Sequence, residues 1–361
     1  MTQPLRPQLH VDLAALKRNY TSLATIRPEA TTASVVKADA YGLGVARIAP
    51  ALYEAGCRIF YVAYGFEGAA LREMVGAAAE IIVLSGPFEN DLEQFTQADL
   101  TPVLNTPAQV TLWAGQARAR CQLHIDTGMN RLGMSPQEAL ALLDQPGLTQ
   151  SLNVTALISH FACAATPGKA MNKKQIDQFT DICIALGAIW PDAKTSLSAS
   201  AGLFLEMAAD ETLVRPGISL YGSSPQEHPQ EILATVATLS APVLQLRALK
   251  KGEAVGYGST YKPTAPTRIA TLGIGYGDGL PRALGNKGQV ILHRTPCPIV
   301  GTVSMDMISV DVSDVRADIS IGDRVEIFGA SNAIEEVART AGTISYDLLA
   351  KLTPRVLRVY G

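Results

Sequence analysis

The chain has 361 residues, 47% of them hydrophobic, so it can bury one large core and a smaller second one, and we expect two domains. A formal net charge of -3 and a pI near 6.0 give no electrostatic basis for binding nucleic acid or an anionic membrane. We find no apolar stretch of signal-peptide or transmembrane length, and the five cysteines lack metal-type spacing. We therefore expect a cytoplasmic protein with free thiols and no metal site.

Short β-branched runs alternate with amphipathic stretches through about residue 222, and this alternation predicts a (β/α)8 TIM-type barrel rather than an open sheet. The predicted strands are 32–37, 58–63, 80–84, 101–104, 121–126, 154–159, 194–198 and 213–221, and the predicted helices include 45–56, 106–117 and 172–188.

Beyond the segment 223–229 the pattern changes to strand runs broken by glycine and proline, which predicts a mostly antiparallel β domain. We assign residues 10–228 to the barrel and 229–361 to the β domain, which residues 1–9 can also join. The predicted strands there are 235–248, 268–274, 289–293, 298–303, 308–312 and 323–328, with a short helix near 333–341.

Lys37 ends the first β-branched run and is followed at once by Ala38-Asp-Ala-Tyr-Gly-Leu-Gly44. A lysine partly withdrawn from water favours its neutral form, which can attack an aldehyde and later act as a base. Pyridoxal phosphate is the obvious aldehyde. A lone Val-Val-Lys would more often be a surface lysine that closes a strand, but Tyr41 and the two glycines close behind favour the functional interpretation.

The order of the motifs agrees with a barrel, in which catalytic groups gather at the carboxyl ends of the strands. Arg131 follows the fifth predicted strand, His160 the sixth and Ser200 the seventh. Gly217 lies in the eighth strand region, where its backbone amide can approach an anion closely. We expect all of these residues on one rim.

The segment 36–44 resembles the cofactor-attachment segment of alanine racemases, which are pyridoxal-phosphate enzymes. The resemblance continues along almost the whole chain, at 124–133, 159–161, 214–222, 256–258, 273–279 and 301–306.

The resemblance implies a homodimer with shared active sites and a role for each matching residue. Lys37 would hold the cofactor and move the α-proton on one face of the substrate, and Tyr257 of the second subunit would do so on the other face. His160 would link that tyrosine to Arg215, which meets the pyridine nitrogen. The other matching residues are Tyr41, Ser200, Gly217, Ile218 and Tyr346 at the phosphate, and Arg131 with the Met305 amide at the substrate carboxylate.

Taken singly, several of these residues have ordinary structural explanations. His160 could be a core histidine, Tyr257 a hairpin aromatic and Arg215 a loop anchor, and the glycines of 273–277 are a weak dinucleotide signature without a βαβ unit.

Three residues depart from the family pattern. Ala199 replaces a common asparagine, Ser304 replaces a cysteine, and His124 stands where some members have a carbamylated lysine that orients the arginine, so another group or an ion must orient Arg131.

We therefore expect an alanine racemase that supplies D-alanine to the bacterial cell wall. A small pocket bounded by Tyr276, Tyr346 and Met305 would suit a methyl group, but a serine or broad-specificity racemase could use the same residues, because an apolar slot rejects an added hydroxyl only weakly. A noncatalytic cofactor-binding barrel would not need Tyr257 or the β domain. A barrel-type decarboxylase would share Lys37 but should have a different phosphate loop.

Overall fold

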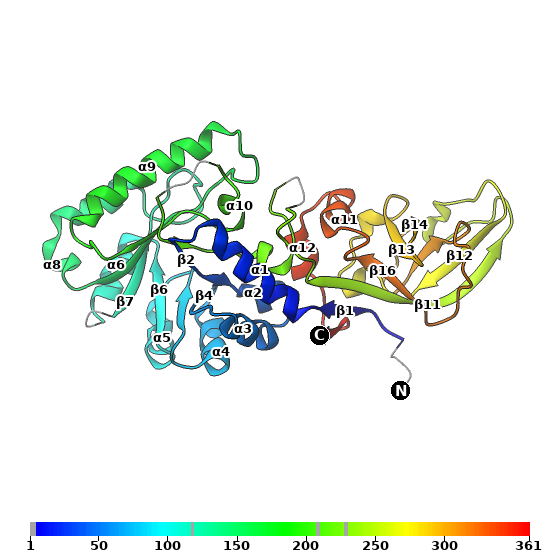
Figure 1. Cartoon of the computed structure of the whole chain (residues 1–361), viewed down its shortest axis with the longest axis horizontal. Helices are drawn as coiled ribbons and strands as arrows, with labels where there is room; N and C mark the ends of the chain where they lie inside the picture. The colour runs from blue at the N-terminus through cyan, green and yellow to red at the C-terminus, as the bar shows by residue number, and fades with distance from the viewer. Residues whose placement is uncertain (1–4, 117–118, 207–209, 227–229) are drawn as a thin grey trace.

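The computed structural model describes residues 5–116, 119–206, 210–226 and 230–361. Figure 1 shows two bodies along the long axis, one in which helices surround strands and one built mainly from strands. The expected barrel followed by a mostly antiparallel β domain is confirmed. The expected domain boundary between residues 228 and 229 lies outside the described residues, as does residue 117 at the end of the predicted helix 106–117.

The first body is a barrel of parallel strands. Seven of them form one sheet in chain order, and β2 (Thr31–Thr32) pairs in parallel with β10 (Leu213–Val214). The ring closes because Ala33 N donates to Val214 O at 2.9 Å and Thr212 N donates to Thr195 O at 3.0 Å. The seven strands are β3 (Ser34–Val35), β4 (Ile59–Val62), β5 (Glu80–Val83), β6 (Leu100–Leu104), β7 (Arg120–His124), β8 (Asn153–Ile158) and β9 (Lys194–Ser196).

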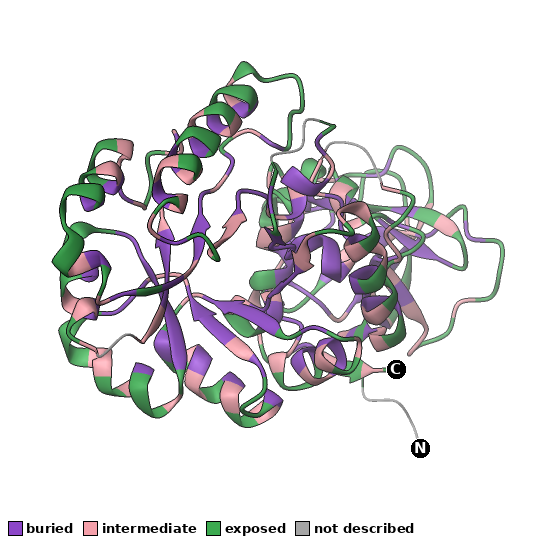
Figure 2. Cartoon of the chain, turned by 60° about the vertical axis from the view of Figure 1, so that its left-hand side comes forward, coloured by how far each residue is buried: buried purple, intermediate pink, exposed green. Residues whose placement is uncertain are grey.

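Helices cover the outside of the ring, so the strands are buried on both faces. Every residue of β4 and β6 is buried, whereas the outer surfaces of the helices are exposed (Figure 2). The helices are α1 (Leu13–Ile26), α3 (Val45–Glu54), α4 (Gly65–Val75), α5 (Leu92–Gln97), α6 (Pro107–Ala114), α7 (Pro136–Leu140), α8 (Pro146–Thr149), α9 (Ala170–Gly187) and α10 (Ser200–Leu203).

The prediction of a strand over 213–221 was wrong beyond Val214. Pro216 has no amide hydrogen for a ladder, and the chain turns at Gly217 into the 3₁₀ helix η3 (Ile218–Tyr221). The apolar residues of η3 are buried, so the segment has the same apolar composition as a buried strand.

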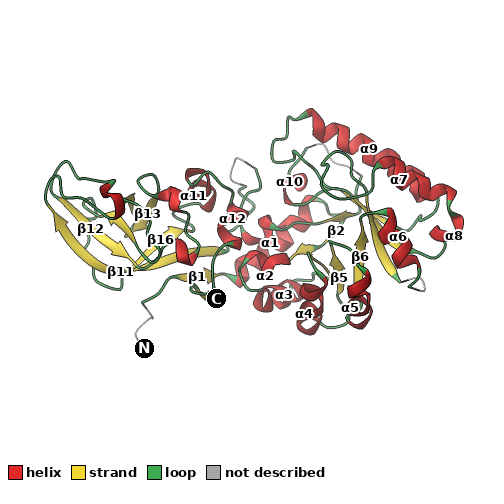
Figure 3. Cartoon of the chain, turned by 180° about the vertical axis from the view of Figure 1, so that it is seen from behind, coloured by secondary structure: helices red, strands yellow, loops and turns green. Residues whose placement is uncertain are grey.

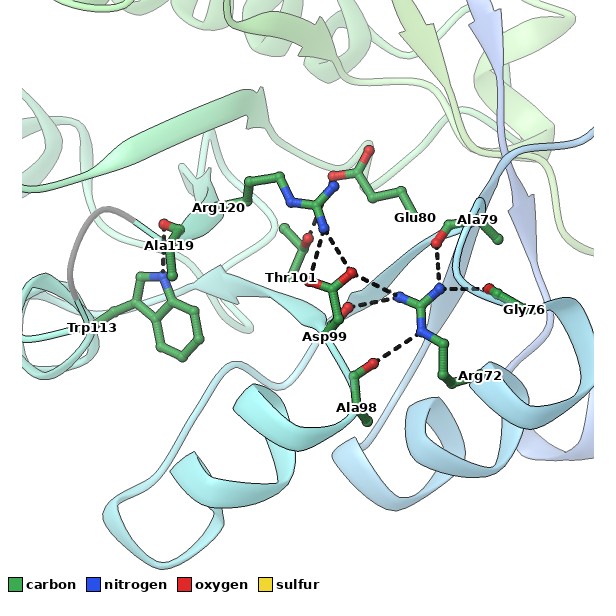
Figure 4. Close-up of polar contacts among 10 residues, drawn as sticks. All are labelled: Arg72, Gly76, Ala79, Glu80, Ala98, Asp99, Thr101, Trp113, Ala119 and Arg120. Carbon is green, nitrogen blue, oxygen red and sulfur yellow. Dashed lines mark hydrogen bonds and ion pairs between the residues drawn. The ribbon is translucent and has the colours of Figure 1, made fainter.

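The amino ends of the barrel strands are tied together by Arg72 and Asp99 (Figure 4). Arg72 of α4 donates to backbone carbonyls around β5 and β6, and the Asp99 carboxylate pairs with Arg120 at 3.0 Å. The carbonyl acceptors of Arg72 are Gly76, Ala79, Ala98 and Asp99, at 2.6–3.0 Å. This network lies at the amino ends of the barrel strands, opposite the end at which catalytic residues gather. Residues at the amino ends of such barrels stabilise the fold.

The second body is one eight-stranded sheet in the order β12-β15-β14-β13-β16-β11-β1-β17, with a further β11–β12 pairing (Figure 3). The β1 strand (Gln8–Val11) pairs antiparallel with β11 (Ala237–Leu249) and parallel with β17 (Leu357–Tyr360), so strands from both ends of the chain join this sheet. The remaining elements are β12 (Thr267–Leu272), β13 (Gln289–Leu292), β14 (Thr295–Val300), β15 (Ile308–Asp311), β16 (Arg324–Phe328), α11 (Ile334–Thr340) and α12 (Ser345–Ala350).

Contacts between the two bodies position the site. The side-chain amide of Asn19 in α1 donates to Leu220 O at 3.2 Å and to Ala234 O at 2.9 Å, and it accepts from Ala234 N at 2.8 Å. These bonds join the barrel to the segment that leads into β11. The helix α12 packs against the turn that follows β3. No helix in the described part of the chain is both long enough and apolar enough to cross a bilayer.

Candidate active site

The chain makes a left-handed helical turn directly after Lys37. The helix α2 (Lys37–Tyr41) contains four consecutive non-glycine residues, 38–41, with φ between 53 and 58°. A left-handed conformation costs roughly 1–2 kcal/mol per L-residue, so this turn costs about 4–8 kcal/mol. Such a conformation persists only where the surroundings fix it, and it is concentrated at functional sites.

Charged side chains hold the left-handed turn at its start and at its end. At the start, the Glu67 carboxylate accepts from Ala38 N at 2.7 Å, and within the turn the Asp39 carboxylate accepts from Val45 N at 2.7 Å. At the end, the Arg358 guanidinium donates to Gly42 O at 2.9 and 3.1 Å, and Tyr360 Oη donates to Leu43 O at 2.9 Å. Hydrogen bonds to charged groups contribute about 1.5–3 kcal/mol each, so the four bonds made by Glu67, Asp39 and Arg358 can offset the cost of the turn.

The amine of Lys37 lies in a part-buried cluster of positive side chains at the carboxyl rim. Burial lowers the pKa of Lys37, the nearby Arg131 and Arg215 lower it further, and Glu67 opposes them by raising it. Burial and the same cations lower the pKa of His160 to about 3. The structure thus brings together Lys37, Arg131, His160 and Arg215 as the sequence predicted, and the cluster favours an anionic ligand.

Arg215 is buried and bound by the barrel itself. Its Nε donates to Ser196 Oγ at 2.9 Å, its Nη2 donates to Ser159 O, and its guanidinium lies 5.9 Å from the centre of the Tyr61 ring. It is 5% exposed, and burial lowers its pKa. The guanidinium is therefore fixed at the base of the site and remains a cation.

His124 is a neutral hydrogen-bond donor toward Asn105. The Asn105 Nδ2 donates to Leu84 O at 3.1 Å and to Val103 O at 2.9 Å, so its Oδ1 is the acceptor of the 2.8 Å contact with His124 Nδ1. The His124 proton is therefore on Nδ1, which leaves Nε2 with a lone pair. Burial lowers the pKa of His124 to about 4, with contributions from Arg215 and Arg131, so the ring is neutral at pH 7.

An anion-binding cradle lies beside the cluster, at the start of α10 and η3. Gly217 N and Ser219 N both donate to Ser200 Oγ, at 2.9 and 3.2 Å. A Cβ added to Gly217 would collide with Tyr41 Oη, so only glycine lets these groups approach one another. The Ser219 hydroxyl is buried and has no hydrogen-bond partner among the described residues.

The remaining cradle residues complete an aromatic wall. The Tyr41 ring lies 5.0 Å from that of Tyr221 and 5.9 Å from that of Tyr346 of α12. Burial raises the pKa of both Tyr41 and Tyr346, the latter to about 12, so both phenols are protonated donors at pH 7. Ile218 is fully buried at the start of η3. These residues fit a phosphate group whose oxygens accept from hydroxyls and backbone amides.

Tyr257 and Met305 lie in exposed loops of the β domain. Tyr257 is 74% exposed, in the connection between β11 and β12, which lies at the end of the β domain away from the barrel (Figure 1). Met305 is 52% exposed, and its carbonyl accepts from Gly277 N at 2.8 Å. Of the residues expected to bound the pocket, Tyr346 packs against Tyr41 at the cradle, and Tyr276, 42% exposed, lies in the loop beside Met305.

The sequence interpretation missed Glu67, Asn105 and Arg358. Glu67 lies five residues after the end of β4, in the first turn of α4. From sequence alone, an acidic residue at this position is interpreted as a helix cap rather than as a site residue. Asn105 comes directly after β6, the position at which polar side chains reach a barrel rim. The contact of Arg358 with Gly42 joins residues far apart in the chain, and local sequence carries no signal for it.

The fold and these residues define a class of protein, a barrel enzyme with a reactive lysine beside a phosphate-type cradle. The part-buried amine of Lys37, the Ser219 hydroxyl without a hydrogen-bond partner and the glycine cradle fit a phosphorylated aldehyde. Among the described residues no cluster of three or more His, Cys, Asp or Glu side chains is placed to hold a metal ion.

Comparisons with known proteins identify the family. The family model "Alanine racemase, N-terminal domain" matches residues 11–225, and "Alanine racemase, C-terminal domain" matches residues 236–360. The alanine racemase of Brucella abortus is 41% identical over 371 aligned residues, which cover 98% of this chain and 93% of that protein. That of Acidiphilium cryptum is 41% identical, with 98% of each chain covered. The chain belongs to the alanine racemase family, as its motifs predicted.

Solved structures agree with this assignment. The alanine racemase of Bartonella henselae with covalently bound pyridoxal phosphate has a TM-score of 0.93 and 34% identity, over 99% of this chain and 100% of that one. The biosynthetic alanine racemase of Pseudomonas aeruginosa has a TM-score of 0.91 and 34% identity over the same shares of the two chains.

The two neutral histidines predict a loss of stability in acid. In the unfolded chain both histidines become protonated below about pH 6.5. In the folded chain the pKa of His124 is about 4 and that of His160 is about 3, so both rings stay neutral to lower pH. Their contribution to stability is complete above pH 6.5 and is lost as the pH falls toward 4, at about 1.4 kcal/mol per pH unit for each group. His124→Asn keeps a donor to Asn105 but does not titrate, so the free energy of unfolding should fall less between pH 6.5 and 5.

Urea unfolding at several pH values measures this slope. Equal slopes for wild type and His124→Asn would contradict the assignment of a neutral buried ring.

Proposed function

We propose that this protein interconverts L- and D-alanine with pyridoxal phosphate as its cofactor. The observation that carries the proposal is the left-handed turn, which holds a lysine of lowered pKa beside a phosphate-type cradle in a chain of the alanine racemase family. The structure of the Bartonella henselae alanine racemase contains covalently bound pyridoxal phosphate, which supports this cofactor.

The residues of the rim divide into those that hold the cofactor and those that orient the substrate. Lys37 would bind the aldehyde carbon, and Arg215 would meet the pyridine nitrogen. The phosphate contacts would come from Tyr41, Ser200, Gly217, Ile218 and Tyr346. When bound, pyridoxal phosphate withdraws electrons from the substrate Cα and so makes its hydrogen acidic. Because Arg215 remains a cation, it would keep a proton off the pyridine nitrogen and moderate this withdrawal.

Lys37 is suited to move the α-proton on one face. Its lowered pKa makes a neutral amine more accessible near pH 7 than for an ordinary lysine. Arg131 would bind the substrate carboxylate, with the Met305 amide as a second donor. The His124 Nε2 lone pair offers a neutral acceptor in the neighbourhood of Arg131, in place of a carbamylated lysine.

Racemisation needs a second acid–base group on the opposite face, and we propose Tyr257 of a second copy of the chain. Within one chain Tyr257 is exposed and lies in the connection between β11 and β12, at the end of the β domain away from the barrel. It belongs to an exposed apolar set with Tyr276, Met305 and Met307, a composition typical of an interface. His160 and Arg215 would then support the tyrosine from the barrel side, and the enzyme would be a homodimer.

Alanine is the substrate that the family assignment favours, and serine or a broader range of amino acids is the alternative. Supply of D-alanine for peptidoglycan is the physiological role that we propose. The five cysteines, all free in the structure, support a reducing compartment and therefore the cytoplasm.

Isotope exchange tests the activity directly. Purified protein with its cofactor is incubated with L-alanine, L-serine or L-lysine in deuterated water, and the products are analysed by chiral separation and mass spectrometry. We expect D-alanine with one deuterium at Cα and slower reaction with the other two. Loss of carbon dioxide would indicate a decarboxylase, and no exchange would indicate a binding protein, so either would refute the proposal.

Tyr257→Phe should nearly abolish turnover from L-alanine while the cofactor stays bound, because a positioned acid–base group contributes about 10²–10⁴-fold. Chiral analysis of the product gives the rate, and the visible absorbance gives cofactor occupancy. Tyr53→Phe, in helix α3, is the control. Unchanged rates in both directions would exclude Tyr257 as a base.

A mixture of two inactive variants tests whether the tyrosine comes from the partner. If sites are shared, refolded mixtures of Lys37→Ala and Tyr257→Phe should regain about a quarter of wild-type activity, because half of the dimers carry one intact site of two. No recovery on mixing would refute the shared site.

A further inference from the structure

We propose that Glu67 is a positioning residue for Lys37, because its carboxylate joins the ends of two neighbouring barrel strands. This inference rests on the proposed function only for its catalytic consequence. The structural part concerns the turn after Lys37 and is testable without any assumption about the substrate.

The two carboxylate oxygens of Glu67 serve different strands. Oε1 accepts from Ala38 N at 2.7 Å, at the start of the left-handed turn after β3. Oε2 accepts from Ala63 N at 2.7 Å and from Tyr64 N at 3.1 Å, directly after β4. The side chain comes from the first turn of α4, whose own position is fixed by Leu71 and Val75 in the core.

Capping of α4 does not account for this arrangement. A capping glutamate accepts from backbone amides at the start of its own helix, which describes Oε2 but not Oε1. The bond to Ala38 reaches a neighbouring strand and fixes the residue that follows Lys37 in the chain. Glu67 therefore sets where the left-handed turn begins.

The same carboxylate acts on the charge of Lys37. Burial, Arg131 and Arg215 all favour loss of the Lys37 proton, and Glu67 is the group that opposes them in the structure. Its charge and its hydrogen bond thus act together. The bond orients the lysine backbone, and the charge limits how far the pKa of the amine falls.

Glu67→Gln tests both effects, because the amide keeps the shape but turns one acceptor oxygen into a donor that faces an N–H. Glu73→Gln, on the exposed side of the same helix, is the matched control. Hydrogen–deuterium exchange of peptides covering 36–44 should be about tenfold faster in the holoenzyme of Glu67→Gln and unchanged in Glu73→Gln. The kcat for alanine should fall at least tenfold while KM changes less than threefold.

A pH readout distinguishes positioning from a purely structural role. After removal of the cofactor, the rate at which pyridoxal phosphate recombines should reach half of its maximum at a lower pH in Glu67→Gln, since a neutral side chain no longer raises the pKa of Lys37. If Glu67→Gln folds poorly, Glu67→Asp replaces it, because the shorter side chain can still cap α4 but does not reach Ala38.

Unchanged exchange over 36–44 in both variants would overturn the proposal, and so would faster exchange with unchanged kcat and pH profile. An inactive wild type would refute the proposed function instead, and the exchange and recombination measurements would still decide the role of Glu67.

Discussion

The structure depends on one costly piece of backbone, the left-handed turn after Lys37. Four L-residues in that conformation are unstable alone, and the surrounding charges compensate for them. Glu67 holds the start of the turn from α4, and Arg358 holds its end from the last strand of the β domain. The barrel therefore does not complete its own site, because residues from the other end of the chain are needed to hold the lysine in place.

The cation cluster and the cradle follow from that arrangement. With the lysine fixed at the end of β3, Arg131 and Arg215 are near enough to lower its pKa, and the cradle of Ser200 and Gly217 lies at the ends of β9 and β10. Such a site repels cations and favours a ligand with a phosphate and a carboxylate. The neutral histidines His124 and His160 add hydrogen-bonding groups without adding positive charge.

Much of the fold was predictable because the barrel strands are buried on both faces and therefore read as short apolar runs such as Ile59–Val62. The candidate site residues of the barrel were predictable through motifs at strand ends. The left-handed turn was not, since Ala38-Asp-Ala-Tyr contains no glycine to indicate positive φ. The contact of Arg358 with Gly42 and the pairing of β1 with β17 depend on long-range packing, which local patterns do not encode.

We propose that the left-handed turn makes Lys37 the amine that receives the cofactor. Reduction of the holoenzyme with borohydride fixes the cofactor to its lysine, and peptide mass spectrometry then locates it. We expect a pyridoxyl group on Lys37, in a peptide that contains Ala38–Tyr41. A pyridoxyl group on a different lysine, or a holoenzyme with no lysine modified, would contradict it.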